Sequence, residues 1–262
     1  MQCISSKTNT SRLSKGFTLI EVLVIAPIVI LAIMVFVGII VTLTGDVLRT
    51  NGSNDFVNAT QSALDAIEQD VAESSTTFLA TSYTPASPQG ITGTTNFDGS
   101  SPFTANATSP ARLIIRSLTT TTSPLVSGKQ LIYKTVPACT GSSAVPFTVD
   151  VVYYLNGSTL WRRVIDPSLN GANGAGTPCS TPWQAPSCSP GYVAAICKAE
   201  DNEIVNNIAS VTVDYLNSTG VSVGSTPTVG AVAAKITLAT TNTVAGRTDT
   251  YTAPSRTIII PQ

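Results

Sequence analysis

The chain has 262 residues, of which 11% are charged; its formal net charge is −1 at pH 7, and it contains no histidine. The missing imidazole removes the commonest general base and zinc ligand, and no P-loop or G-x-G-x-x-G motif is present. The sequence therefore predicts neither an enzyme, a cofactor nor a metal site. The sequence also shows no basic nucleic-acid footprint, which disfavours a nucleic-acid partner without excluding one.

Residues 1–16 form a basic, Ser/Thr-rich leader with Lys7, Arg12 and Lys15 and no acid. Residues 22–45 carry no charge, and a helical membrane span needs about 20 apolar residues. No small-residue cleavage site follows them, so the segment does not fit an ordinary secretory signal peptide. The positive-inside rule puts the basic end in the cytoplasm, which predicts a single-pass membrane protein with an extracytoplasmic C-terminal part.

Glu21 is unexpected at the start of this run, because a carboxylate costs about 2.5–3.5 kcal/mol at mid-membrane, and less near an end. It can be tolerated in the headgroup zone, or it can pair with a cation. Cleavage after Gly16 would supply that cation as the α-amine of Phe17, which is close to Glu21 in the sequence. If the amine belonged to a neighbouring subunit, the pair would set the offset at which the helices stack.

The stretch KGFTLIEVLV, residues 15–24, closely resembles the class III signal of type IV prepilins and type II secretion pseudopilins. The resemblance implies that a prepilin peptidase cuts between Gly16 and Phe17, that the Phe17 amine is methylated, and that Glu21 is the assembly carboxylate. The partners it implies are other pilin subunits, in a homo- or hetero-filament, the peptidase, an inner-membrane assembly platform and membrane lipid.

Pro27 departs from this family pattern, in which Ala or Ile is more usual at that place. A proline removes a helical hydrogen bond and clashes with the preceding turn. We therefore expect a kink at residues 23–27, or a helix that is regular only beyond them, within a transmembrane or filament-core helix covering residues 17–45.

Residues 46–75 are predicted to contain an amphipathic helix, over roughly residues 54–73. Apolar side chains from Phe56 to Val71 recur there at spacings of three and four, and acids fill the opposite face. Gly52 could loosen the join to the apolar segment, and Ser53 or Asn54 could then act as the helix N-cap.

Residues 76–262 are predicted to form a β-rich extracytoplasmic domain. A Ser/Thr/Pro/Gly-rich surface excursion is expected over residues 74–110. Asn156-Gly157 lies between two β-rich runs and predicts a two-residue hairpin turn. The expected strands cover residues 111–118, 129–136, 148–155, 158–165, 208–216, 220–223, 231–239, 248–251 and 257–260. The predicted fold class is α+β, with a long N-terminal helix packed on an antiparallel sheet domain that has long loops.

The four cysteines beyond the leader are Cys139, Cys179, Cys188 and Cys197. Their even number in loop-rich sequence predicts two disulfides, for which three pairings are possible, and hence an oxidising compartment. We favour Cys139 bonded to Cys179 or Cys197, together with one local bridge. No C-x-x-C pair is present, so a metal site is not indicated.

Two groups of charged residues remain. Arg162 and Arg163 should point to opposite faces of their strand, either as solvated edges or toward an anionic partner. Glu200, Asp201 and Glu203 are expected to be a solvated acidic cluster, with a weak calcium site as the alternative.

The order of the later elements is similar to that of the J-type minor pseudopilin of type II secretion and of competence-type minor pilins. A tyrosine-rich strand is followed by GSTLWRRV, a long loop, IVNNIASVTVDYLNSTG and AAKITLAT. The function expected from both resemblances is that of a structural filament subunit, more in keeping with a minor than a major one. The alternative is an uncleaved, single-span protein that presents a β-domain as a binding module.

Overall fold

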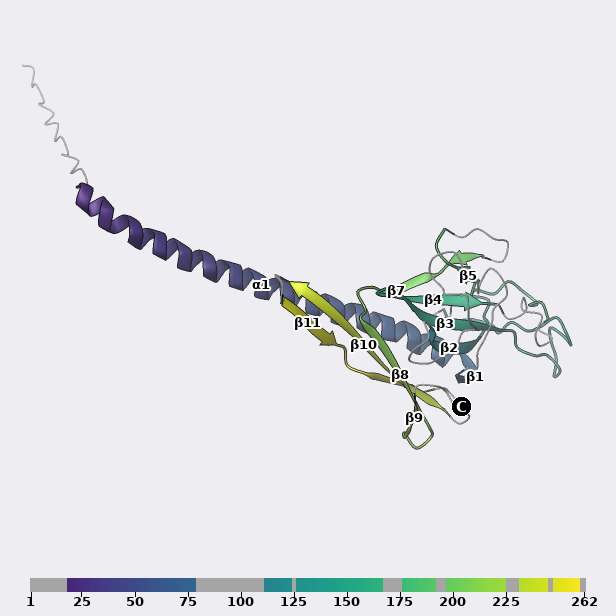
Figure 1. Ribbon diagram of the computed structural model, residues 1–262. Coiled ribbons are helices and arrows are strands. Elements are labelled where there is room, and N and C mark those ends of the chain that lie inside the picture. The colour runs from purple at the N-terminus through teal and green to yellow at the C-terminus, as the bar shows by residue number, and fades with distance from the viewer. Residues whose placement is uncertain are drawn as a thin grey trace, which may run out of the picture. The chain divides into compact units, whose positions relative to one another are not determined.

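The computed structural model of the chain describes residues 18–78, 111–123, 126–166, 176–191, 197–224, 231–244 and 247–259 (Figure 1). The chain divides into two compact units at Thr50–Asn51. Helix α1 (Leu19–Ala72) supplies the described part of the first unit and continues into the second, which also contains the described strands. The fold class is α+β, as predicted.

Helix α1 is continuous where the sequence suggested two irregularities. It begins at Leu19 and contains Pro27, so helical structure is present on both sides of the proline; the kink itself stays a prediction. It also runs through Gly52, so Ser53 and Asn54 are interior residues and not an N-cap. The amphipathic stripe is confirmed, because the buried residues of α1 are Phe56, Thr60, Ala63, Leu64, Ile67 and Val71.

The first sheet is antiparallel, in the order β1-β2-β3-β4-β7 (Figure 1). Its strands are β1 (Ser74–Phe78), β2 (Ala111–Leu118), β3 (Thr148–Asn156), β4 (Thr159–Ile165) and β7 (Asn202–Val205). The predicted β3–β4 hairpin is present, but its two-residue loop is Gly157–Ser158, one position later than expected. Gly157 has a φ of 58°, a left-handed conformation that glycine adopts without steric cost.

The second sheet is also antiparallel and is built around the long strand β10. Its strands are β8 (Ser210–Leu216), β9 (Ser222–Gly224), β10 (Ala233–Val244), β11 (Arg247–Thr252) and β12 (Arg256–Ile259). The first half of β10 pairs with β8 and β12, and its second half pairs with β11. The described strands therefore form two main antiparallel sheets, together with the short parallel pair β5 (Ser187–Cys188) and β6 (Ala199–Glu200).

Two strand predictions were wrong. Residues 129–136 make isolated bridges to flanking segments and no regular strand. Two of those bridges involve Pro146 and Pro178, which have no N–H to donate to a ladder. Residues 74–78 form strand β1, although their sequence, Ser-Ser-Thr-Thr-Phe, lacks apolar alternation and the sequence predicts a surface excursion there. The rest of the predicted excursion, residues 79–110, lies outside the described residues.

The main core of the second unit lies between α1 and the two sheets. The buried stripe of α1 packs with side chains of β2, β3, β8 and β10, such as Ile115, Val151, Tyr215 and Ile236. A smaller cluster contains one residue of β3 and one of β4, together with two residues outside these strands: Val149, Val164, Ile132 and Phe147. β3 is buried almost throughout, on both faces, and its one charged residue, the buried Asp150, pairs with Arg116 of β2 at 2.8 Å.

Candidate functional site

The first unit presents a long apolar surface that is exposed in the isolated chain. Its large apolar side chains, from Leu19 to Leu48, are between 43% and 84% exposed. By length and composition, α1 is the helix among the described residues that could cross a membrane. An exposed apolar surface of this kind indicates contact with lipid or with another protein. These features fit a single-pass membrane protein.

The N-terminal end of α1 is capped by Thr18. The Glu21 N–H donates to Thr18 Oγ1 at 3.3 Å and to the Thr18 carbonyl at 3.0 Å. Threonine at the N-cap with glutamate three positions later is the pattern of a capping box, and a carboxylate there also interacts favourably with the helix dipole. The Thr18-Leu19-Ile20-Glu21 sequence carried this signal, but our sequence reasoning missed it.

The Glu21 carboxylate pairs with no donor in the part of the chain that the structure describes. Gly16 and Phe17 lie outside the described residues, so the cleavage and methylation predictions stay predictions. The described geometry at this end is therefore a capped helix that begins with an unpaired carboxylate on an otherwise apolar surface.

Three residues join α1 to the first sheet, and we name Asp70, Tyr153 and Arg162 the helix clamp. Arg162 donates to Asp70 through Nε at 2.6 Å and through an Nη at 2.9 Å, and the Tyr153 hydroxyl donates to Asp70 Oδ2 at 2.5 Å. Burial alone would lower the pKa of Arg162, but the hydrogen bonds and charge of Asp70 outweigh it and raise that pKa. Arg162 therefore joins the first sheet to α1 through an ion pair within the protein, and it is not the solvated edge residue that we expected.

The helix clamp predicts an alkaline pH dependence of stability. Burial, and next the charge of Asp70, raise the pKa of Tyr153 well above its ordinary value of 10.0. The folded-state pKa exceeds the unfolded one, so this stabilisation is complete below pH 10 and is lost as the pH rises further. Above pH 10 the free energy of unfolding of the parent should fall with pH more steeply than that of Tyr153→Phe, by about 1.4 kcal/mol per pH unit. Thermal denaturation between pH 8 and 11 measures this difference.

Tyr133→Phe is the matched control, because Tyr133 is half-buried outside the clamp. If Tyr153→Phe loses stability above pH 10 as steeply as the parent, the assignment of this dependence to Tyr153 is wrong.

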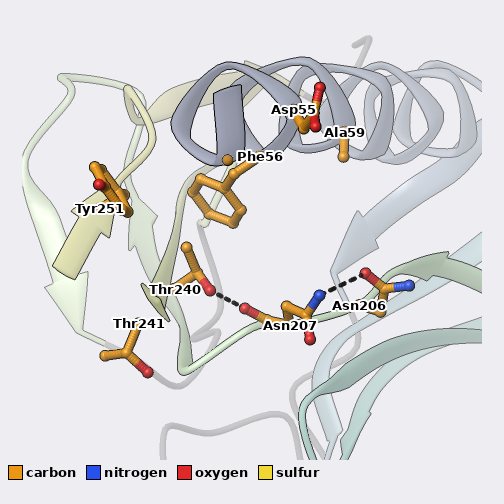
Figure 2. A pocket seen from close by; sticks show the side chains of 9 residues that line it. Asp55, Phe56, Ala59, Asn206, Asn207, Thr240, Thr241 and Tyr251 are labelled. Atoms are coloured by element: carbon orange, nitrogen blue, oxygen red, sulfur yellow. Dashed lines mark hydrogen bonds between the residues drawn. The ribbon is translucent and has the colours of Figure 1, made fainter. Parts of the chain in front are cut away.

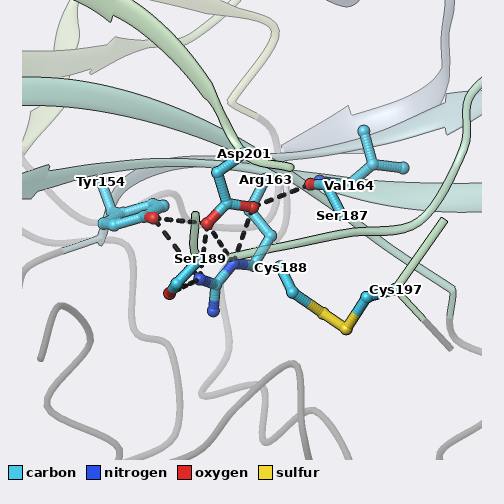
Figure 3. A network of polar contacts seen from close by, with 8 residues as sticks. All are labelled: Tyr154, Arg163, Val164, Ser187, Cys188, Ser189, Cys197 and Asp201. Atoms are coloured by element: carbon cyan, nitrogen blue, oxygen red, sulfur yellow. Dashed lines mark hydrogen bonds and ion pairs between the residues drawn. A yellow bond between two sulfur atoms is a disulfide. The ribbon is translucent and has the colours of Figure 1, made fainter. Parts of the chain in front are cut away.

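Arg163, the next residue, lies at the centre of a buried network on the other side of β4 (Figure 3). It is 2% exposed, and its Nη2 donates to Asp201 Oδ2 at 2.6 Å and to Ser189 Oγ at 2.7 Å. Tyr154 and Ser187 donate to the same carboxylate at 2.7 Å and 2.9 Å. Asp201 is thus a buried counter-ion, and the expectation that it belongs to a solvated acidic cluster was wrong.

The disulfides are Cys139–Cys179 and Cys188–Cys197. One favoured pairing, Cys139 with Cys179 plus a local bridge, is confirmed. Cys188 lies between the two serines of the Arg163 network, so the local bridge holds the chain beside the buried ion pair (Figure 3). Both bridges are compatible with an extracytoplasmic domain.

No protein-family model matches this sequence, and neither a curated protein nor a solved structure matches it significantly. The structure shows a long N-terminal apolar helix followed by a domain of antiparallel β-sheets.

Proposed function

We propose that this chain is a pilin-like structural subunit, of the minor kind, in a type IV pilus or a type II secretion-like filament. In this proposal a prepilin peptidase removes residues 1–16, and the mature chain begins at Phe17. An inner-membrane assembly platform then extracts it from the lipid and adds it to other pilin subunits. The outcome is a filament at the cell surface or in the periplasm.

The observation that carries the proposal is the exposed apolar surface of α1, which begins with Glu21, a carboxylate that has no partner among the described residues. Such a surface can be buried by lipid before assembly and by the equivalent helices of other subunits afterwards. Neighbouring subunits would supply a cation that lipid tails do not, because the Phe17 amine of a neighbour would neutralise the Glu21 carboxylate. Burying a carboxylate without a cation is costly, so the pair favours one axial offset between neighbouring helices.

The capped helix end supports the same function. The hydrogen bonds from Glu21 and Val22 to Thr18 start the helix at Leu19, two residues after the proposed new N-terminus. The amine would thus lie close to the Glu21 carboxylate at the start of the helix. The two disulfides support placing the β-sheet domain outside the cytoplasm, in an oxidising compartment where disulfides persist.

The intact mass of the mature protein, purified from cells that contain a functional prepilin peptidase, tests this proposal. We expect the loss of residues 1–16 and the addition of one methyl group on the Phe17 amine. A chain that keeps its first residues would overturn the proposal and favour the alternative, an uncleaved single-span binding module. A peptidase-deficient strain is the control, since there the full-length mass is expected in either case.

A further inference from the structure

A polar pocket lies in the second unit, at the point where α1, the turn after β7, and the β10–β11 pair converge (Figure 2). Its volume is about 410 Å³, within the roughly 300–1,000 Å³ typical of small-molecule sites. Figure 2 shows the Phe56 ring projecting from α1 toward Thr240, with Tyr251 on the neighbouring strand and Asp55 on the helix above.

The turn that forms one wall is held in place by the protein itself. Asn207 has a φ of 57°, the left-handed conformation, and its carbonyl accepts a hydrogen bond from the Thr240 hydroxyl. The Asn207 Nδ2 donates to Asn206 Oδ1 at 3.3 Å, and Asn206 in turn donates to Glu203. These contacts fix the two amide side chains at the pocket before any ligand arrives, which reduces the entropic cost of binding.

Several polar groups at the pocket have no partner among the described residues. They are the carboxylate of Asp55 and the hydroxyls of Thr241 and Tyr251. Asp55 and Thr241 are exposed, and Tyr251 is half-buried with its ring packed against the main core. Helix α1 and strands β10 and β11 thus each contribute one polar group that could form a hydrogen bond with a ligand.

The chemistry of this lining selects among ligand classes. Asp55 is the charged residue of the described lining, so it would repel a phosphate or a carboxylate. A quaternary ammonium group would be matched in charge by Asp55, but it has no N–H to donate, so it would displace water from the amides and hydroxyls without replacing those hydrogen bonds. Vicinal hydroxyl groups suit all of these partners, because a hydroxyl can donate to the carboxylate and can both donate to and accept from amides and other hydroxyls. The half-buried Tyr251 ring offers apolar surface to the C–H face of a sugar ring.

We propose that this pocket binds a neutral saccharide, with the Asp55 carboxylate, the Asn206 and Asn207 amides and the Tyr251 hydroxyl holding ring hydroxyls. The chain would then carry glycan recognition in its β-domain. This inference does not depend on filament assembly, since all of the lining belongs to the second unit.

The test is calorimetric titration of the full-length protein in amphipol, which carries no sugar headgroup. The saccharide probes are glucose, galactose and N-acetylglucosamine, and the non-saccharide probes are choline chloride and inorganic phosphate. We expect saturable binding of at least one saccharide and of neither other probe. Asp55→Asn should weaken that binding about tenfold, the usual loss for one hydrogen bond to a charged group.

Two further variants separate binding from folding. Tyr251→Phe keeps the packed ring and removes its hydroxyl, so it should weaken binding with an unchanged melting temperature. Glu68→Gln is the matched control for Asp55→Asn, because it removes the same charge from the same helix outside the pocket, and its affinity should equal that of the parent. The proposal is overturned if no saccharide saturates, if choline or phosphate saturates instead, or if Asp55→Asn and Tyr251→Phe both bind like the parent.

Discussion

Replacing Glu21 with valine should leave membrane insertion and leader cleavage largely intact while it abolishes or sharply reduces incorporation into filaments. Valine suits a lipid-exposed helix at least as well as glutamate, so the inserted precursor should accumulate. In the filament the Phe17 amine of a neighbouring subunit would lose its counter-ion, and leaving one partner of a buried pair uncompensated costs about 3–5 kcal/mol. The measurement is the ratio of this chain in sheared filaments to that in the membrane fraction.

Two further substitutions make this experiment specific for the charge. Glu21→Gln keeps the size and removes the charge, so it should fail as Glu21→Val does. Asp46→Asn removes a carboxylate from the same helix just beyond the apolar run and should assemble normally. If either uncharged variant at position 21 enters filaments as well as the parent, the proposed charge pairing is wrong.

Replacing Arg163 with methionine should lower the free energy of unfolding by about 3–5 kcal/mol. The substitution leaves the Asp201 carboxylate, which is 5% exposed, without its cation and removes the donor to Ser189. The donors that remain, the hydroxyls of Tyr154 and Ser187, are neutral and cannot balance a buried charge. Thermal unfolding in one fixed detergent, followed by near-ultraviolet circular dichroism, measures the loss.

Arg256→Met is the matched control, because Arg256 is 38% exposed and pairs with Asp65 and Glu68 on the surface of α1. Solvent screens such pairs, so this variant should lose at most about 1 kcal/mol. Removing both charges of the buried pair, in Arg163→Met with Asp201→Leu, should recover part of the loss. A loss no larger at Arg163 than at Arg256 would contradict the structural importance of the network.

Features that depend on near neighbours in the chain were predictable. The spacing of Phe56, Ala63 and Val71 repeats with the helical period, and the runs on both sides of Asn156-Gly157 are dense in β-branched and aromatic residues. Both signals are complete within one element, so the amphipathic helix and the β3–β4 hairpin could be placed before the structure was known. The hairpin loop was misplaced by one residue, because either Asn156 or Gly157 could have opened the turn.

Features that depend on residues distant in the chain needed the three-dimensional structure. Alternation along β4 places Arg162 and Arg163 on opposite faces of the strand. It cannot reveal that Arg162 forms an ion pair with Asp70 and that Arg163 forms one with Asp201. Without their partners, both arginines resemble ordinary solvated charges. The same limit applies to β1, whose five polar-rich residues become a strand because β2 offers them an edge to pair with.

Composition and local pattern sufficed for the apolar N-terminal segment, its single carboxylate and the even number of cysteines, because each is a property of the chain itself. The division of the strands between two sheets, the disulfide pairing and the pocket beside Asp55 were settled by tertiary packing. These features arise when segments tens of residues apart meet, and which segments meet is determined by burial summed over the whole core and not by any one stretch of sequence.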